Sequence, residues 1–355
     1  MKNAPIKITR GAIETQSLLA SVIVPAFNAK DDIVDCVKPI LDSDYKNIEI
    51  LVVDDCSSDG TADRVRNLPC LVLRTDRRSG PAGTRELGIR HSKGDVLVFI
   101  DVDIVVEKTT IRRLIESLCE NPGIASVSGD YDTSGSCRNL CSLYQKSYNE
   151  YKRIFLPPYG PYINTSIYCI PREIMQSAGG FRTDVYTGED YELGLRLASQ
   201  GHTSYFNRSI LVAHNKRVNF TQLIRQKFQY ATNVTMLKLE FEKNNKSLKI
   251  DLKRTFSVAV DQIIAAALSW PLIISGCLAL IFPASIFGRL TLALFLGYCL
   301  SSARFWIFLF KTVGITAIPF IPISFLDHAV SGLSAIIGFV RFRLHLSYWK
   351  FKGIS

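Results

Sequence analysis

The chain has 355 residues, 47% of them hydrophobic, and a formal net charge of +10 at pH 7. This length accommodates one large domain and a smaller region beside it. Residues 1–255 have the composition of a soluble α/β protein, whereas the chain is mostly apolar from about Phe256 onward. We do not expect nucleic acid as a partner, because no recognised binding module is present and many basic residues flank the apolar region.

The nine cysteines are scattered and form no CxxC pair. Neither a zinc site nor a disulfide framework is therefore indicated, and a reducing compartment is the simplest inference. Residues 1–20 contain no continuous apolar stretch, so we expect no secretory signal.

Short apolar runs and helical patterns alternate along the chain. We expect strands at residues 21–25, 48–53, 70–74, 96–100, 125–128, 163–171 and 210–213, and helices at 31–41, after the loops 54–61 and 77–85, and at 137–154, 172–177, 189–198 and 220–239. The alternation in the first half is typical of right-handed βαβ units and a doubly wound sheet. In the helix at 137–154, Tyr144, Tyr148 and Tyr151 share one face, which favours a core stripe over an acceptor platform.

Two acids, Asp101 and Asp103, follow the apolar strand at 96–100 directly. Ligands collect outside the carboxyl ends of strands in α/β sheets. Carboxylate oxygens there can hold a divalent cation, and that cation can bind a diphosphate. An isolated Asp-x-Asp pair is more often a strand end with solvated acids, so this interpretation depends on the other motifs.

Six short motifs occur in a fixed order. They are Val24-Pro25-Ala26-Phe27-Asn28, Val53-Asp54-Asp55 with Ser58-Asp59-Gly60-Thr61, Gly80-Pro81-Ala82 with Arg85, Asp101-Val102-Asp103, Gly179-Gly180-Phe181, and Glu189-Asp190 leading to Arg196-Leu197. Together they resemble glycosyltransferase family 2, whose members are inverting, nucleotide-sugar-dependent enzymes with the GT-A fold. The resemblance covers residues 21–231.

The resemblance implies a nucleotide-sugar site and a metal, Mn²⁺ or Mg²⁺. The expected nucleotide-sugar-binding residues are Pro25, Ala26, Asn28, Asp54, Asp55, Arg85 and Asp101. Asp103 is the expected metal ligand, with Asp101 nearer the ribose or the metal's waters. His214 is either a further ligand or an ordinary polar cap, and Lys216 and Arg217 have the same two interpretations toward the phosphates. For Arg85 the alternative to a phosphate contact is a surface ion pair.

The family's catalytic base maps to Asp190, with Glu189 positioning the acceptor or the base. An inverting transfer needs a base on the face opposite the leaving group. Adjacent acids repel one another's charge, which raises a pKa. The alternative for both residues is a helix N-terminus whose dipole favours acids.

Two departures from the family pattern are visible. Processive members carry Gln-x-x-Arg-Trp, and the matching place here, Gln226 to Tyr230, lacks both the Arg and the Trp, so we expect a single addition. Glu86 stands where relatives often have Asn, and the sequence assigns it no effect.

Three apolar stretches follow, at residues 258–282, 290–310 and 315–340, each long enough to span a bilayer. The third contains Pro319, Pro322 and Asp327. We expect Asp327 to pair with Arg304 of the second stretch, the alternative being that Arg304 meets a lipid phosphate. Three spans would place the basic tail away from the catalytic domain, against the positive-inside rule. Two spans, with the Pro-containing stretch re-entrant or interfacial, are favoured, and three remain open.

The expected organisation is an N-terminal extension (1–20), a GT-A domain (21–240), a basic linker (241–255), transmembrane helices (256–340) and a basic tail (341–355). We expect an integral, multi-pass membrane protein with a cytoplasmic catalytic domain. Its expected reaction moves one sugar from a nucleotide-sugar to a lipid-linked or glycan acceptor in cell-surface polysaccharide or glycolipid synthesis. A UDP-sugar is the expected donor, on family frequency and the Asp54-Asp55 loop. Glycan-assembly proteins are possible partners.

Several alternatives stay open. One is a polyprenyl-phosphate sugar synthase, whose ionised phosphate acceptor hardly needs a base. A second is a non-catalytic nucleotide-sugar-binding scaffold of a glycan assembly complex, against which the intact acids argue. In another alternative, the apolar region only anchors the protein and the acceptor is soluble. A lipid or polymer transporter is disfavoured, because the chain has so few candidate spans.

Overall fold

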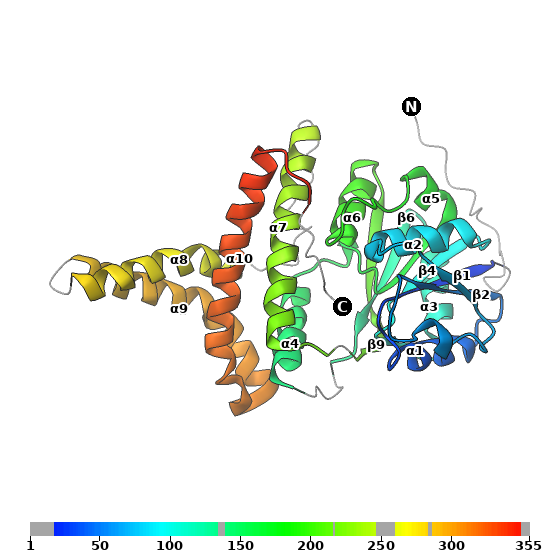
Figure 1. The fold of residues 1–355 in the computed structure, drawn as a ribbon, viewed down its shortest axis with the longest axis horizontal. Coiled ribbons are helices and arrows are strands. Elements are labelled where there is room, and N and C mark those ends of the chain that lie inside the picture. Colours follow the sequence, from blue (N-terminus) through cyan, green and yellow to red (C-terminus); the bar gives the residue numbers. More distant parts are fainter. Residues whose placement is uncertain (1–17, 134–138, 216, 246–259, 283–285, 349–355) are drawn as a thin grey trace.

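The structure is a computed structural model that describes residues 18–133, 139–215, 217–245, 260–282 and 286–348. Figure 1 shows an α/β domain flanked on one side by long helices of the C-terminal region. The helix α7 lies between the α/β domain and the helix α10 (Figure 1). The helices α8 and α9 lie side by side, and the far end of this pair projects away from both (Figure 1), whereas the Trp270 indole of α8 donates to the Ala329 carbonyl of α10.

The domain is built on a nine-stranded mixed sheet within the described residues, in the order β3-β2-β1-β4-β8-β6-β9-β5 with β7 on β9. The strands are β1 Ala20–Ala26, β2 Ile48–Asp54, β3 Leu71–Arg74, β4 Val96–Ile100, β5 Ile104–Val105, β6 Ile124–Tyr131, β7 Tyr159–Gly160, β8 Ile167–Pro171 and β9 Thr203–His214. The strands β1 to β4 are parallel, as the doubly wound pattern predicts. The strand β8 runs antiparallel to β4 and β6, which makes the sheet mixed.

Helices cover both faces of the sheet (Figure 1). The described helices are α1 Ile33–Leu41, α2 Gly80–His91, α3 Thr110–Glu120, α4 Leu140–Ile154, α5 Arg172–Ser177, α6 Glu189–Ser199, α7 Phe220–Asn244, α8 Val260–Ile281, α9 Ile286–Val313 and α10 Phe320–Arg343, with 3₁₀ turns at Ala62–Arg64 and Gly314–Ala317. The helices α1 and α3 pack on one face, and α2, α5 and α6 pack on the other. Parallel strands buried on both faces explain the continuous apolar runs.

Side-chain alternation along each strand decides which layer a residue joins. In β4, Val96 and Val98 face α1 and α3, whereas Leu97 and Phe99 face α2, α5 and α6. The helix α3 was not predicted from the sequence. Its signal was an apolar pattern at Ile111, Leu114, Ile115 and Leu118, which is the spacing of one helical face.

The tyrosine stripe of α4 is core, as expected, but the core lies between the α/β domain and the C-terminal helices. Tyr144, Tyr148 and Tyr151 are all buried, and they pack with Phe305 of α9 and Phe320 of α10. These aromatic contacts therefore pack α9 and α10 directly against α4 of the domain.

Three described helical segments are long and apolar enough to cross a membrane: Val260–Ile281, Ile286–Ala317 and Phe320–Arg343. The third is continuous, although a proline-broken stretch was expected. Pro319 precedes its first residue and Pro322 lies in its first turn, where a missing N–H removes no intrahelical hydrogen bond.

The expected pairing of Asp327 with Arg304 is wrong. Asp327 instead lies 2.8 Å from the Lys227 ammonium of α7 and accepts a hydrogen bond from the Tyr144 hydroxyl at 2.8 Å. Arg304 is exposed, and its guanidinium lies 5.2 Å from the ring centre of Phe155. Asp327 thus joins α10 to α7 and α4.

The helix α10 runs along α7 in close contact. A Cβ added at Gly338 would lie 2.5 Å from the carbonyl oxygen of Thr232, so a glycine is needed at this crossing. Further along, the Tyr348 hydroxyl donates to Glu240. The helix α7 ends at Asn244, inside the expected linker, and residues 246–259 lie outside the described part of the chain.

Candidate active site

A cavity of about 390 Å³ opens at the carboxyl ends of β1, β2 and β4, beside the N-termini of α2 and α6. This is the edge at which α/β sheets collect ligands. Most of the predicted residues line it, namely Pro25, Ala26, Asp55, Arg85, Asp101, Asp103, Glu189 and Asp190. Three do not: Asn28, Asp54 and His214.

A buried arginine joins two of the motifs. Arg85 is 1% exposed, and its Nη1 donates to Glu189 at 2.8 Å while its Nη2 donates to Asp101 at 2.6 Å. Burial alone would lower the pKa of Arg85, but the two carboxylates raise it, so the cation is retained. Arg85 thus forms ion pairs through both terminal nitrogens, as its alternative interpretation expected, but they are buried rather than at the surface.

Asp101 is held from two sides. Besides the Arg85 contact, its Oδ2 accepts a hydrogen bond from the Ser166 hydroxyl at 2.6 Å. Ser166 precedes β8, the reversed strand beside β4, and also lines the cavity. Arg85 and Ser166 thus hold Asp101, whereas Asp103, the second acid of the Asp-x-Asp motif, contacts a different residue.

That partner is His214, at the end of β9. Its Nε2 lies 3.2 Å from Asp103 Oδ2, and its ring stacks on Tyr131 with centroids 4.6 Å apart. The short strand β5 brings them together, because Ile104 pairs with His214 in the antiparallel β5–β9 ladder. Within the described residues, no group of three or more His, Cys, Asp and Glu side chains has the spacing of a complete metal site.

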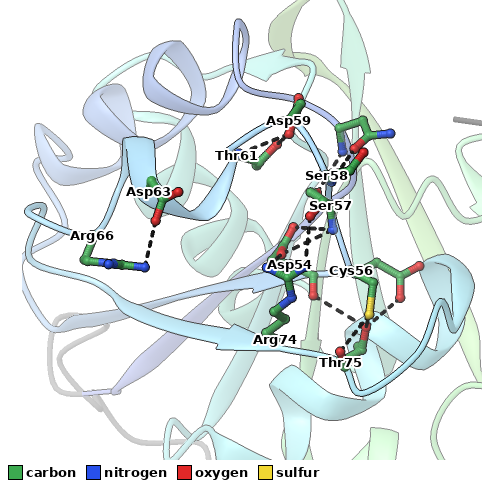
Figure 2. A network of polar contacts seen from close by, with 12 residues as sticks. Asp54, Cys56, Ser57, Ser58, Asp59, Thr61, Asp63, Arg66, Arg74 and Thr75 are labelled. Atoms are coloured by element: carbon green, nitrogen blue, oxygen red, sulfur yellow. Dashed lines mark hydrogen bonds and ion pairs between the residues drawn. The ribbon is translucent and has the colours of Figure 1, made fainter.

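The two acids after β2 have different surroundings. Asp54 is fully buried; its carboxylate accepts from the Ser57 N–H and lies 3.5 Å from Arg74 (Figure 2). Asp55 lines the cavity and caps the start of α2, where its Oδ2 accepts from the Gly80 N–H at 2.8 Å. Asp54 therefore organises the loop, and only Asp55 faces the cavity.

Asn28 also belongs to this loop network. It adopts a positive φ of 44°, its Oδ1 accepts from the Ser58 N–H at 3.0 Å, and its own N–H donates to the Ser57 hydroxyl at 2.9 Å. Figure 2 shows how Ser57, Ser58, Asp59 and Thr61 converge around the neighbouring turn. The contacts of Asn28 shape the entrance loop and place Phe27 at the cavity.

Glu189 and Asp190 are the first two residues of α6, and Gly188 is its N-cap. The φ of Gly188 is 89°, a backbone conformation that suits glycine. Glu189 points to Arg85, and Asp190 Oδ1 accepts from the Tyr191 N–H at 2.7 Å. Burial first, and then the charge of Glu189, raise the pKa of Asp190 from 3.8 to about 7. A carboxyl with that pKa can accept a proton near neutral pH.

The Gly179-Gly180-Phe181 turn packs beneath the site. Phe181 meets the Phe99 ring of β4 edge-on at 5.4 Å, and its N–H donates to Glu86 at 2.5 Å. The Arg196 Nη2 donates to the Gly180 carbonyl at 2.7 Å. This arrangement gives Glu86, to which the sequence assigned no effect, a structural explanation.

Several cavity residues were not predicted from the sequence. They are Phe27, Arg78, Thr165, Ser166, Tyr186, Thr187 and Tyr230. The Arg78 guanidinium lies 3.2 Å from the centre of the Phe27 ring. A basic loop after β3 was the available signal for Arg78; for Ser166 and Tyr230 the sequence offered none. Arg217 is exposed and does not line the cavity, and Lys216 lies outside the described residues.

Comparison with known proteins places these motifs in one family. Residues 21–176 match the model of glycosyl transferase family 2, and residues 146–318 match that of glycosyl transferase family group 2. The two matched ranges together extend from the first strand to the second long apolar helix.

Two curated relatives are informative. Dolichyl N-acetyl-alpha-D-glucosaminyl phosphate 3-beta-D-2,3-diacetamido-2,3-dideoxy-beta-D-glucuronosyltransferase of Methanococcus voltae is 25% identical over 59% of this chain and 71% of its own length. The Escherichia coli enzyme UDP-Glc:alpha-D-GlcNAc-diphosphoundecaprenol beta-1,3-glucosyltransferase WfaP is 35% identical, over 27% of this chain and 40% of its own length. The match to the second relative thus spans less than half of that protein.

Among solved structures, the mannosyltransferase PcManGT from Pyrobaculum calidifontis superposes with a TM-score of 0.55 at 17% identity, over 97% of this chain and 90% of that one. This likeness concerns the fold. The chain belongs to glycosyltransferase family 2, with a GT-A catalytic domain followed by three helices long and apolar enough to span a membrane.

Proposed function

We propose that this protein is a membrane-bound, inverting glycosyltransferase that moves one sugar from a nucleotide-sugar to a lipid-linked acceptor. One observation carries the proposal: a single cavity is lined by Asp103, which contacts His214, and by Asp190, whose pKa is raised to about 7. The same cavity thus holds a carboxylate that can bind the metal of a diphosphate, Asp103, and a base that can accept the proton of an acceptor hydroxyl, Asp190.

The residues present fit a divalent cation, Mn²⁺ or Mg²⁺. Asp103 and His214 offer an oxygen and an imidazole nitrogen, and both side chains are partly exposed, at 26% and 22%. Oxygens of a diphosphate and water would complete such a set. When bound, the ion would neutralise the charge of the leaving diphosphate. Asp101, held by Arg85 and Ser166, is better placed toward the ribose or the metal's waters.

The nucleotide is assigned to the wall formed by the β1 and β2 loops. Asp55 Oδ2 accepts from the Gly80 N–H, and a carboxylate oxygen has room for a second donor, such as a uracil N–H or a ribose hydroxyl. The Phe27 ring under Arg78 offers an aromatic face and a cation at the same wall. UDP is the proposed nucleotide.

In the proposed reaction, Asp190 takes the proton of the acceptor hydroxyl while that oxygen attacks the anomeric carbon in one displacement. Arg85 acts as a positioning residue, since it links Asp101 on the donor side to Glu189 beside the base. Glu189 also keeps the pKa of Asp190 high through charge repulsion.

The lipid-linked acceptor follows from where the C-terminal helices pack. They contact α4 and α7, and Tyr230 of α7 also lines the catalytic cavity. The named substrates of the two curated relatives include a dolichyl phosphate sugar and a diphosphoundecaprenol sugar. Anchoring at the bilayer raises the local concentration of such acceptors.

We assign two full spans, α8 and α9, and an interfacial position to α10. The helix α10 follows α7 through the contacts Lys227–Asp327 and Thr232–Gly338. The helix α7 carries six charged residues, Arg225, Lys227, Lys238, Glu240, Glu242 and Lys243. If α10 crossed the bilayer, it would draw these charges into hydrocarbon, which is costly. The far end of the α8–α9 pair projects away from α7 and α10 (Figure 1). Apolar side chains there are exposed, such as Leu280 at 85%.

This arrangement returns Arg341, Arg343 and the basic tail to the side of the catalytic domain. It satisfies the positive-inside rule with a cytoplasmic catalytic domain.

The test is release of free nucleoside diphosphate by detergent-purified protein. A panel of nucleotide-sugars is supplied with and without Mn²⁺ or Mg²⁺, and with and without total polar lipid extract. Asp103→Asn and Asp190→Asn are compared with Asp184→Asn, which removes an exposed acid paired with Arg182. We expect metal-dependent release that rises with lipid extract, is lost in the first two variants and persists in the third.

Two results would contradict the proposal. No release from any donor, despite tight binding of UDP, would indicate a non-catalytic nucleotide-sugar-binding protein. Full activity of Asp190→Asn would indicate a polyprenyl-phosphate sugar synthase, because an ionised phosphate acceptor needs no base.

A further inference from the structure

Two lysine ammoniums from different helices converge on one tyrosine ring outside the donor cavity. Lys152 Nζ of α4 lies 5.1 Å from the centre of the Tyr148 ring, and Lys227 Nζ of α7 lies 3.4 Å from the same centre. The ring is buried against Phe305 of α9, with centroids 5.6 Å apart. The two cations therefore lie where the catalytic domain meets the C-terminal helices.

When both lysines are protonated, the positive charge here exceeds the negative charge. Lys227 is paired with Asp327 at 2.8 Å, and its side chain is 13% exposed. Lys152 has no carboxylate within 4 Å among the residues that the structure describes. Burial first, and then the charge of Lys227, lower the pKa of Lys152 to about 7. A partly desolvated cation without a counter-ion is unfavourable, and a bound anion would remove that cost.

The location indicates which anion would bind. Lys227 lies on α7 three residues before Tyr230, which lines the catalytic cavity together with Asp190. Neither lysine lines the donor cavity, where the nucleotide diphosphate is placed. Phe305 of α9 and Phe320 of α10 belong to the same hydrophobic cluster as Tyr148.

We propose that Lys152 and Lys227 bind the phosphate group of the lipid-linked acceptor, with its polyprenyl chain running toward α9 and α10. This inference deepens the proposed function and rests on it for the identity of the acceptor. The ammoniums act as point charges and hydrogen-bond donors to phosphate oxygens. The phosphate is that of a polyprenyl phosphate or diphosphate carrier rather than that of bulk phospholipid, because α7 carries both Lys227 and the cavity residue Tyr230.

The first experiment measures binding of farnesyl phosphate to the full chain in phosphatidylcholine nanodiscs with EDTA, with farnesol as the uncharged comparison. Lys152→Met is expected to weaken farnesyl phosphate binding at least ten-fold and to leave farnesol binding unchanged. Lys152→Arg is expected to restore most of the affinity. Lys238→Met is the matched control, since Lys238 lies on α7 eleven residues beyond Lys227, and its ammonium is 3.7 Å from Glu242.

Lys227 needs a second variant, because Lys227→Met leaves the buried Asp327 without its cation. The double variant Lys227→Met/Asp327→Asn removes both charges and keeps the helix contact neutral. We expect it to fold, as judged by its melting temperature, and still to bind farnesyl phosphate at least ten-fold more weakly than the wild type. Wild-type affinity in this folded double variant would overturn the assignment of Lys227.

Failure of this inference is separable from failure of the proposed function. Asp103→Asn is expected to lose nucleotide release yet to bind farnesyl phosphate normally. Equal binding by the wild type and Lys152→Met would overturn the site, even if glycosyl transfer is established. If phosphatidylglycerol in the nanodiscs competes fully with farnesyl phosphate, the lysines bind bulk lipid headgroups and the acceptor assignment is wrong.

Discussion

The Nη2 atom of Arg85 lies 2.6 Å from Asp101 Oδ1, and its other terminal nitrogen binds Glu189. One buried guanidinium thereby links Asp101 to Glu189, the residue that precedes the proposed base Asp190. Such a bridge needs the planar fork of arginine, because a lysine ammonium cannot place donors at both carboxylates in fixed geometry.

We therefore expect Arg85→Lys to lower kcat about 100-fold, the loss that a small misplacement of catalytic groups causes. The melting temperature should also fall, since two carboxylates lose their shared partner. Nucleotide release and thermal melts measure the two effects. Arg90→Lys on the exposed face of α2 is the control, and equal activity of both variants would argue against a positioning role for Arg85.

The raised pKa of Asp190 predicts the pH profile of transfer. The base must be ionised, so kcat/KM should rise with pH through a midpoint near 7 instead of near the ordinary 3.8. Glu189→Gln removes the repelling charge, which should move the midpoint to lower pH. A profile that is flat between pH 5 and 8 would show that Asp190 is not the base.

The raised pKa of Asp190 also predicts how the free energy of unfolding depends on pH. Stability should fall as pH rises, whereas activity should increase. Between about pH 4 and 7 the folded chain holds a proton on Asp190 that the unfolded chain has lost, so stability falls as pH rises through this window. Asp190→Asn should melt a few degrees higher than the wild type at pH 8, where about 1 kcal/mol corresponds to 2–4 °C. The difference should vanish below pH 4.

His214 offers a test of the proposed metal site with a substitution that keeps the local packing. His214→Phe keeps the aromatic stacking on Tyr131 and removes the nitrogen that faces Asp103. We expect the Mn²⁺ concentration for half-maximal activity to rise about ten-fold, within the range that loss of a supporting group produces. Unchanged metal dependence with normal activity would assign His214 to capping alone.

A side chain added at Gly180 should strain the backbone and the contact with Glu86. Its φ is 72°, and an added Cβ would overlap Glu86 Oε1. Gly201 is a matched control, with a φ of 83° and nothing within 4 Å of an added Cβ. Gly201→Ala should cost about 1 kcal/mol through backbone conformation alone, and Gly180→Ala about 1–3 kcal/mol. Coupling between Gly180→Ala and Glu86→Ala in a double-mutant cycle would isolate the contact; additivity would contradict it.

The two-span arrangement is tested with protease sites in the full chain, one inserted between Phe282 and Ile286 and one after Ser355. Because α10 follows the charged helix α7, we expect the terminal site to be cut only in inside-out vesicles. The site between α8 and α9 should be cut only in spheroplasts. Cleavage of the terminal site in spheroplasts would establish three spans instead.

Local pattern was sufficient for much of the fold. The buried strands are visible as apolar runs, and the acids of Asp101-Val102-Asp103 and Glu189-Asp190 are recognisable as short motifs. The helix α3 was not predicted, although its apolar positions follow the 3.6-residue period. The reversal of β8 was not predicted either, since strand direction depends on pairing rather than on residue type.

The sequence by itself determined the α/β architecture, the apolar C-terminal region and the acids of the site, because each of these depends on neighbouring residues of one strand, loop or helix. Only the tertiary structure decided that Arg85 joins Glu189, 104 residues away, and that Asp327 pairs with Lys227, 100 residues away, rather than with Arg304. Charge partners are chosen by which helices pack side by side, and a single sequence does not record that choice.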